Sequence, residues 1–277
     1  MITTSVARTE HRSGLPDSHV AVSRRIVVLG ASNVTFGFPL IASACLNSSS
    51  SGGTELHAAH GHGRSFCNRS FVLNRGLPPL PECRIWEELN SRPPVKESWA
   101  LLTDVGNDLI YGLPPEEVAD KVEGVIRQIG QLEMPFTYVA PPLERILKLT
   151  PWQYRITKKV LFPGRTVPWE ILSERVVELD SIVTQLVQNA GGQVRRPRLE
   201  WYGIDPIHIR PQQRVAAWNE ILEAWPFPEK PQTRWPGWNA AHRFWRLAPM
   251  ERSYGKRSYV TSQPSLVRAE KGSIWLY

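Results

Sequence analysis

The side chains that could carry out nucleophilic chemistry lie in three short segments, far apart in the 277-residue chain. Ser32 comes just after the apolar run Ile26-Val27-Val28-Leu29, and Asp205 and His208 form an Asp-x-x-His pair near the end of the regular part of the sequence. Asn107 lies between them, again after an apolar run. A serine hydroxyl, a base and a group that orients the base are the minimum set for acyl transfer. This pattern indicates nucleophilic catalysis.

Each of the three side chains has a role that follows from its chemistry. The free hydroxyl of Ser32 is a poor nucleophile and must lose a proton to attack a carbonyl carbon. A neutral His208 could accept that proton and later return it to the leaving group. Asp205 precedes His208 by three residues, within reach of the ring, and could hold it in the required tautomer. We therefore predict Ser32, Asp205 and His208 as catalytic residues.

The elements expected around these residues alternate between strands and helices, which predicts a mainly parallel sheet covered on both faces. Ser32, Gly63 and Asn107 should then lie at the carboxyl ends of strands, where functional groups gather in such folds. The expected strands are Arg25–Leu29, Thr54–Ala58, Ser98–Asp104, Phe136–Ala140 and Val194–Trp201. The expected helices are Asn33–Ala44, Pro114–Gln131, Trp169–Asn189 and Gln212–Trp225.

Four motifs in this order resemble those of the SGNH hydrolases, also called the GDSL esterase and lipase superfamily. They are, in chain order, Gly30-Ala31-Ser32-Asn33, the glycine Gly63 (with Gly61 as the alternative), Gly106-Asn107-Asp108, and Asp205-x-x-His208. The resemblance covers about residues 23–228. It implies a three-layer α/β/α sandwich with a flavodoxin-like parallel sheet of about five strands, and a hydrolase that acts on esters without a cofactor. Ala31 departs from the family, which usually has aspartate there.

The resemblance also implies an oxyanion hole, whose donors can be argued physically. The carbonyl oxygen of the substrate becomes negatively charged during attack and needs hydrogen-bond donors placed in advance. The expected donors are the backbone amide of Ser32 at a helix N-terminus, the amide of Gly63 and the side-chain amide of Asn107. A glycine suits the second position because no side chain blocks the approach of its backbone.

The chain is expected to have a core domain with additions. Residues 1–22 are expected to be a disordered or extended arm, 23–228 the hydrolase-like domain, and 229–277 a C-terminal extension with nine Lys or Arg, three Glu and four of the 11 tryptophans. That extension either packs over the domain or presents a surface for an anionic polymer or lipid head groups. Residues 142–167, with six basic side chains and one acid, are either a lid or a packed helical insert.

Other site types fit the sequence less well. His57, His60 and His62 form a compact cluster but lack the carboxylate partner that a zinc site of this size would need. Gly30-Ala31-Ser32 lacks the glycine spacing and lysine of a phosphate loop, and Val34 stands where the second glycine of an α/β-hydrolase elbow belongs. Three cysteines and no apolar N-terminal block predict a cytoplasmic chain with reduced thiols and no transmembrane segment.

The predicted function is a serine esterase that works through an acyl-enzyme. The expected substrate is a small-molecule or carbohydrate ester; no nucleic acid partner is expected, and the oligomeric state stays open. An acyltransferase would use the same acyl-enzyme and differ only in its acceptor. A non-catalytic polymer-binding protein of the same fold, using the Trp-rich extension, is the alternative from another class.

Overall fold

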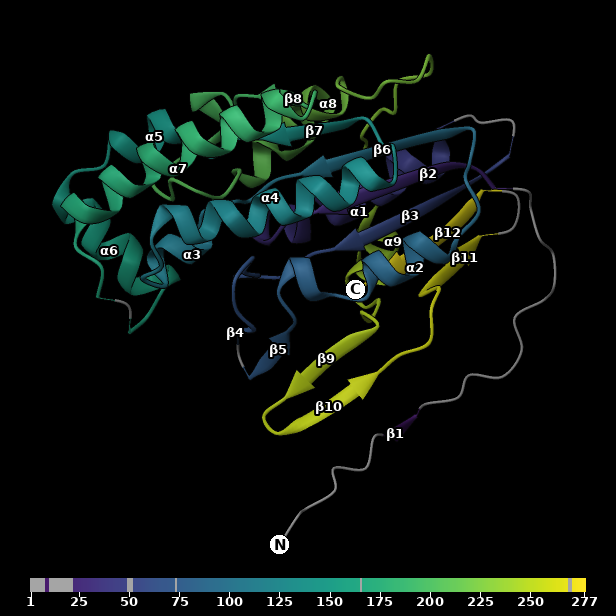
Figure 1. Ribbon diagram of the computed structural model, residues 1–277, viewed down its shortest axis with the longest axis horizontal. Helices are drawn as coiled ribbons and strands as arrows, with labels where there is room; N and C mark the ends of the chain where they lie inside the picture. Colours follow the sequence, from purple (N-terminus) through teal and green to yellow (C-terminus); the bar gives the residue numbers. More distant parts are fainter. Residues whose placement is uncertain (1–7, 10–21, 49–51, 73, 165, 269–270) are drawn as a thin grey trace, which may run out of the picture.

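The computed structural model describes residues 8–9, 22–48, 52–72, 74–164, 166–268 and 271–277, and helices cover both faces of its central sheet (Figure 1). The strands are β1 (Arg8–Thr9), β2 (Val22–Leu29), β3 (Gly53–Ala59), β4 (Ser70–Val72), β5 (Arg75–Leu77), β6 (Glu97–Leu102), β7 (Phe136–Val139), β8 (Gln193–Arg195), β9 (Glu251–Tyr254), β10 (Arg257–Val260), β11 (Leu266–Arg268) and β12 (Gly272–Leu276). The helices are α1 (Ser32–Asn47), α2 (Ile85–Ser91), α3 (Asn107–Ile110), α4 (Pro115–Gln131), α5 (Leu143–Leu147), α6 (Pro151–Leu161), α7 (Trp169–Asn189), α8 (Arg214–Leu222) and α9 (Trp238–Trp245).

The central sheet has the order β11-β12-β3-β2-β6-β7-β8, and its neighbours are parallel except for the pair β11–β12. The part β3-β2-β6-β7-β8 has the strand order of flavodoxin. The predicted fold class, a three-layer α/β/α sandwich with a flavodoxin-like sheet, is confirmed. In such a sheet the chain order reverses between β2 and β6, and ligands bind in the crevice at that point.

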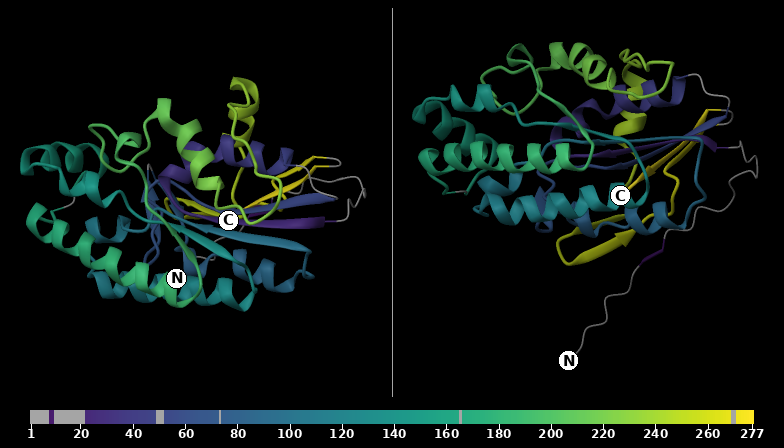
Figure 2. Two further views of the ribbon diagram at one scale, coloured as in Figure 1. Left: turned by 90° about the horizontal axis from the view of Figure 1, so that it is seen from above. Right: turned by 45° about the horizontal axis from the view of Figure 1, so that its top comes forward.

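The two helical layers pack on opposite faces of the sheet because the strand residues alternate in direction. In β2, Val27 and Leu29 belong to the core shared with α2, α4 and α7. Ile26 and Val28 belong to the core shared with α1, α8 and α9. All four side chains are fully buried. Figure 2 shows these layers from above, with the sheet between them.

The number of strands differs from the prediction of about five. Seven strands form the central sheet because the C-terminal extension adds two at one edge, β12 beside β3 and β11 beyond it. The extension also supplies β9 and β10 to a second sheet with the order β1-β10-β9-β5-β4. The expected fifth strand, 194–201, is shorter than predicted: β8 covers only Gln193–Arg195, and Leu199–Trp201 forms a 3₁₀ turn.

The insert 142–167 contains two helices, α5 and α6. α6 begins with a capping box, in which the Thr150 hydroxyl accepts from the Gln153 amide and the Gln153 side chain accepts from the Thr150 amide. Figure 1 shows α5 and α6 beside the start of α7, at one end of the helical layer. Whether this segment acts as a lid stays a prediction.

The prediction of an N-terminal arm over residues 1–22 falls mostly outside the described residues. Within it, Arg8 and Thr9 form β1, which pairs in parallel with Tyr259 and Val260 of β10. Among the helices that the structure describes, none has the length and apolar character needed to span a bilayer.

Candidate active site

The predicted site residues come from elements that end or begin at the same edge of the sheet. Ser32 is the first residue of α1, which follows β2, and Asn107 is the first residue of α3, which follows β6. β2 and β6 are parallel neighbours at the point where the strand order reverses. His208 lies in the loop before the 3₁₀ turn Pro211–Gln213 that leads into α8. The topology thus brings together segments separated by up to 176 residues.

Ser32, His208 and Asp205 form one chain of hydrogen bonds. His208 Nε2 lies 2.8 Å from Ser32 Oγ, and His208 Nδ1 lies 2.7 Å from Asp205 Oδ2. An ionised carboxylate can only accept, so Nδ1 carries the ring proton and Nε2 is free to accept the proton of the Ser32 hydroxyl. The three predicted catalytic side chains therefore meet, with the polarity that a nucleophile, a base and an orienting acid require.

Asp205 is held in its ionised form. Burial acts to raise the pKa of Asp205, but the hydrogen bond and charge of His208 and the amides of Ile207 and His208 outweigh it, so the pKa lies below its ordinary value. The two amides donate to Asp205 Oδ1, both at 3.1 Å. The carboxylate therefore fixes both the loop backbone and the imidazole ring.

Asp104 supports the turn that carries Ser32. It follows β6 with a φ of 60°, and its Oδ2 accepts from the amides of Ala31 at 2.8 Å and Asn33 at 3.0 Å. This carboxylate lies at the N-terminus of α1, where a negative charge is favourable. A residue that follows β6 thus shapes the turn that carries Ser32. This role was not predicted from the sequence, because the contact joins residues 73 positions apart.

Asn33 joins the serine turn to the histidine loop. Its Nδ2 donates to Ile207 O at 2.8 Å and to Asp104 Oδ1 at 2.8 Å, and its Oδ1 accepts from the Ile209 amide at 2.9 Å. The two backbone groups flank His208. The side chain of Asn33 therefore sets the position of the imidazole relative to Ser32, a role that the sequence analysis also missed.

The three expected oxyanion donors lie on neighbouring segments. Gly63 has a φ of 62°, a left-handed conformation that favours glycine, and a Cβ there would approach Tyr111 Oη to 2.7 Å. Asn107 Nδ2 donates to the backbone oxygen of Arg64 at 3.1 Å. A carboxamide has two N–H groups, so the second is left for a ligand. Ser32 and Asn107 line one cavity.

Asp108 links the start of α3, which carries Asn107, to the loop after β3, which carries Gly63. It is fully buried, hydrogen-bonds the Ser65 hydroxyl and accepts from the Phe66 amide at 2.9 Å. Burial raises the pKa of Asp108, against the lowering effect of these hydrogen bonds. The third residue of the Gly-Asn-Asp motif thus has a structural role beside the site.

The three histidines of the compact cluster separate in the fold. His57 is fully buried beside Glu55, His60 Nδ1 lies 3.0 Å from Thr35 Oγ1, and His62 packs against Phe36 with ring centroids 4.8 Å apart. In the part of the chain that the structure describes, no three His, Cys, Asp or Glu side chains converge as metal ligands.

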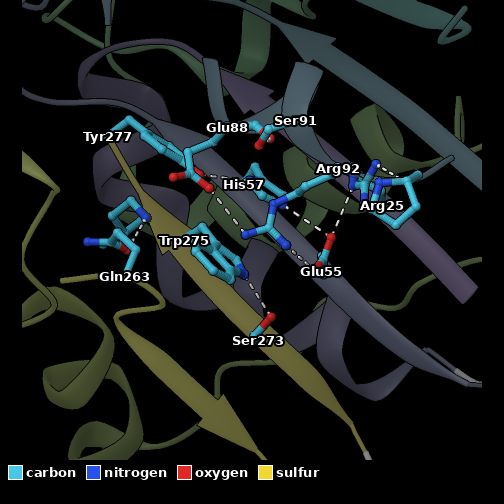
Figure 3. Close-up of polar contacts among 12 residues, drawn as sticks. Arg25, Glu55, His57, Glu88, Ser91, Arg92, Gln263, Ser273, Trp275 and Tyr277 are labelled. Carbon is cyan, nitrogen blue, oxygen red and sulfur yellow. Dashed lines mark hydrogen bonds and ion pairs between the residues drawn. The ribbon is translucent and has the colours of Figure 1, made fainter. Parts of the chain in front are cut away.

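A second chain of acid, imidazole and hydroxyl lies away from the cavity, where β3 meets β12 (Figure 3). His57 Nε2 lies 3.4 Å from Glu55 Oε2, and His57 Nδ1 lies 3.0 Å from Tyr277 Oη. Glu55 also pairs with Arg25 at 3.0 Å and Arg92 at 2.8 Å. We call these five residues the buried cluster.

Burial determines the direction of the pKa shift of His57, but not that of Glu55. Desolvation lowers the pKa of His57 to about 4, against the raising effect of Glu55. The pKa of Glu55 is about 2, because the hydrogen bond and charge of His57 and the charges of Arg92 and Arg25 together outweigh desolvation. The ring of His57 stacks on Tyr277 at 5.9 Å and on Trp275 at 5.6 Å. The cluster therefore stabilises the packing of β12 beside β3.

Comparisons with known proteins give structural matches only. No protein-family model matches the sequence, and no curated protein matches it. The chain is similar in structure to an aryl esterase of M. smegmatis, with 11% identity, a TM-score of 0.44 and coverage of 69% of this chain and 93% of that chain. It is also similar to a psychrotrophic esterase EstA from Pseudoalteromonas sp., with 12% identity and a TM-score of 0.44. That match covers 72% of this chain and 95% of that chain.

A third structural match is AlinE4, described as an SGNH-hydrolase family esterase. It has 18% identity and a TM-score of 0.40, and the match covers 74% of this chain and 98% of that chain. These matches are esterases, and one belongs to the family that the four motifs resemble. At such identities and TM-scores, the function of this chain has to be argued from its own residues.

Proposed function

We propose that this protein is a serine esterase of the SGNH hydrolase type, with Ser32 as nucleophile, His208 as general base and Asp205 as the orienting acid. The observation that supports the proposal is the hydrogen-bonded chain from Ser32 Oγ through His208 to Asp205, with contacts of 2.8 Å and 2.7 Å. These three residues lie near the carboxyl ends of the parallel strands, beside a cavity that Ser32 lines.

In the first half-reaction, His208 Nε2 takes the proton of the Ser32 hydroxyl as Oγ attacks the carbonyl carbon of the ester. The negative charge that develops on the carbonyl oxygen is stabilised by the amide of Ser32, the amide of Gly63 and the second N–H of the Asn107 side chain. His208 then gives its proton to the alcohol oxygen as the carbon–oxygen bond breaks. The alcohol leaves, and the acyl group remains on Ser32.

In the second half-reaction, a water molecule gives a proton to His208 Nε2 and attacks the acyl carbon of the acyl-enzyme. The same donors stabilise the second tetrahedral intermediate. It collapses when the bond to Ser32 Oγ breaks and His208 returns the proton to that oxygen. The carboxylic acid leaves, and the enzyme returns to its starting state.

Reaction with a fluorophosphonate probe tests this proposal. The probe should label Ser32 in the native chain, and Ser32→Ala should lose both the label and the hydrolysis of p-nitrophenyl butyrate. Ser43→Ala is the matched control, because Ser43 lies on the same helix and its hydroxyl only accepts from Asn47 on the exposed surface. Absence of label on native, folded protein would overturn the proposal and favour a binding protein of the same fold.

A further inference from the structure

An apolar cavity opens beside Ser32 and extends under the insert 142–167. On the side of the nucleophile it is lined by Ser32, Asn107 and the segments that follow β6 and β7. On the far side it is lined by α5, α6 and α7, of which Ile146, Tyr154, Leu172 and Val176 are buried. From the sequence, this insert was expected to be either a lid or a packed helical segment. In the structure, the insert covers a space connected to the nucleophile.

The far part of the cavity is largely apolar, with one charged side chain, that of Lys158. Among the described residues, only two charged side chains line the cavity, Asp104 and Lys158. The oxygens of Asp104 accept from Ala31 and Asn33, and Lys158 Nζ donates to Val167 O at 3.1 Å. An acyl group with many hydroxyls would lose much of its hydration against this largely apolar lining, which is unfavourable. A hydrocarbon chain would gain by burial.

The position of the cavity relative to the triad decides which half of the ester it receives. The leaving alcohol must lie close to His208, which protonates it. His208 is not among the described residues that line the cavity, whereas Ser32 and the oxyanion candidate Asn107 are. His208 instead packs against Phe36, with ring centroids 5.4 Å apart. The alcohol side thus lies towards Phe36 and the cavity lies on the acyl side.

We propose that the substrate is an ester of an aliphatic carboxylic acid longer than acetate, whose acyl chain enters the cavity between the sheet edge and helices α5, α6 and α7. This inference rests on the proposed function and specifies its substrate class. Acetylated carbohydrates, which were left open from the sequence, are not the preferred substrates under this proposal, because an acetyl group leaves the apolar part of the cavity unfilled.

Two ester series test the proposal. In p-nitrophenyl esters from acetate through butyrate and octanoate to dodecanoate, kcat/KM should rise by up to about fourfold for each methylene that enters the cavity and then level off. In acetate esters of alcohols of increasing length, kcat/KM should change by less than about threefold in total. A maximum at p-nitrophenyl acetate, or a steep rise in the alcohol series instead, would overturn the proposal.

Two adjacent residues of α7 supply a matched pair of variants. Val176 lines the cavity and is 7% exposed, whereas Val177 faces solvent and is 44% exposed. Val176→Phe should lower the ratio of octanoate to butyrate kcat/KM by about tenfold, as several methylenes lose their space. Val177→Phe should leave that ratio within about twofold of the native value. An equal change in both variants, or none in either, would contradict the proposed chain position.

A third variant covers the case in which Val176→Phe does not fold, as checked by circular dichroism and thermal unfolding. Leu172→Ala enlarges the cavity and should move the optimum to longer chains; an unchanged optimum contradicts the proposal. The ester series measured on the native protein tests the proposed substrate class without any variant. If instead the proposed function is wrong, fluorophosphonate does not label Ser32. Failure of this inference alone leaves the label and places the optimum at acetate.

Discussion

The part of the protein that the structure describes contains two hydrogen-bonded chains of carboxylate, imidazole and hydroxyl. The one that includes Ser32 lies beside a cavity that could receive a substrate. In the candidate triad, His208 joins Asp205 and Ser32 at 2.7 Å and 2.8 Å. In the buried cluster, His57 joins Glu55 and Tyr277 at 3.4 Å and 3.0 Å. Because each carboxylate can only accept, each imidazole donates to its acid and accepts from its hydroxyl.

The environments of the two chains differ. Desolvation lowers the pKa of His57 and raises that of Tyr277, so the Tyr277 hydroxyl does not give up its proton to that ring. Tyr277 is also stacked on His57. Ser32 by contrast begins a helix and, with Asn107, lines the apolar cavity, whose described lining residues do not include Tyr277. The order of groups alone does not make a catalytic site; access for a substrate and donors for the oxyanion are also needed.

Substitution of the two histidines should give the largest contrast. His208→Ala should lower kcat by about 10⁴-fold or more, because the base is lost, while the thermal midpoint changes little. His57→Phe keeps the ring stacking but removes the polar contacts, so kcat should stay within about threefold while the free energy of unfolding falls by about 1–3 kcal/mol. Kinetics and urea unfolding of both variants check this. If both variants were folded and lost activity equally, the assignment of the catalytic role to His208 alone would be wrong.

Removal of an oxyanion donor should have the next largest effect. Asn107→Ala should lower kcat by about 10²–10³-fold, the usual effect of losing one such donor. Fluorophosphonate should still label Ser32, more slowly, because the nucleophile and base remain. Steady-state kinetics and labelling rates measure both effects. A loss below about threefold would show that Asn107 does not hold the oxyanion.

Removal of the Asn33 side chain should lower kcat less than removal of the Asn107 side chain. Asn33→Ala removes the contacts to Ile207 O and the Ile209 amide, so His208 becomes less well placed and kcat should fall by about 10–10²-fold with KM nearly unchanged. Asn47→Ala, at the other end of α1, is the control. An increase in KM at constant kcat would instead mean that Asn33 contacts the substrate.

The buried cluster should make stability depend on pH. The pKa of His57 is about 4 in the folded chain and 6.5 in its ordinary state, so the unfolded chain takes up a proton first and stability falls as pH falls through this window. Between pH 7 and pH 5 the native protein should lose roughly 1–2 kcal/mol more than His57→Phe. Urea unfolding at both values measures this. If the native protein and His57→Phe lost the same free energy of unfolding between these pH values, His57 would not be the cause of the pH dependence.

The sequence predicted the first four core strands, four of the helices and the side chains of the candidate triad, because these depend on local pattern. Apolar runs such as Ile26-Val27-Val28-Leu29 mark buried strands, and the Asp-x-x-His spacing is visible within a few residues. The supports of the site were not predictable in this way. Asp104 and Asn33 act through contacts across 71 and 174 residues, which only the folded chain reveals.

The C-terminal extension was the least predictable part of the fold. Its basic and Trp-rich composition predicted either packing over the domain or a binding surface formed by side chains. Its contribution to the fold comes from the backbone pairing of β12 with β3. Arg92 lies 3.8 Å from the ring centroid of Trp275, so at least one of the extension's tryptophans serves packing. Strand pairing of this kind depends on a partner far away in the sequence and leaves little local signal.

The central claim is that an acyl group is transferred to Ser32, and mass spectrometry of the trapped acyl-enzyme tests it most directly. Native protein mixed with excess p-nitrophenyl octanoate and quenched in acid within the first turnovers should gain the mass of one octanoyl group, and peptide mapping should place that group on Ser32. His57→Phe should give the same result. No adduct in either protein during measurable turnover, or an adduct on a different residue, would contradict the account.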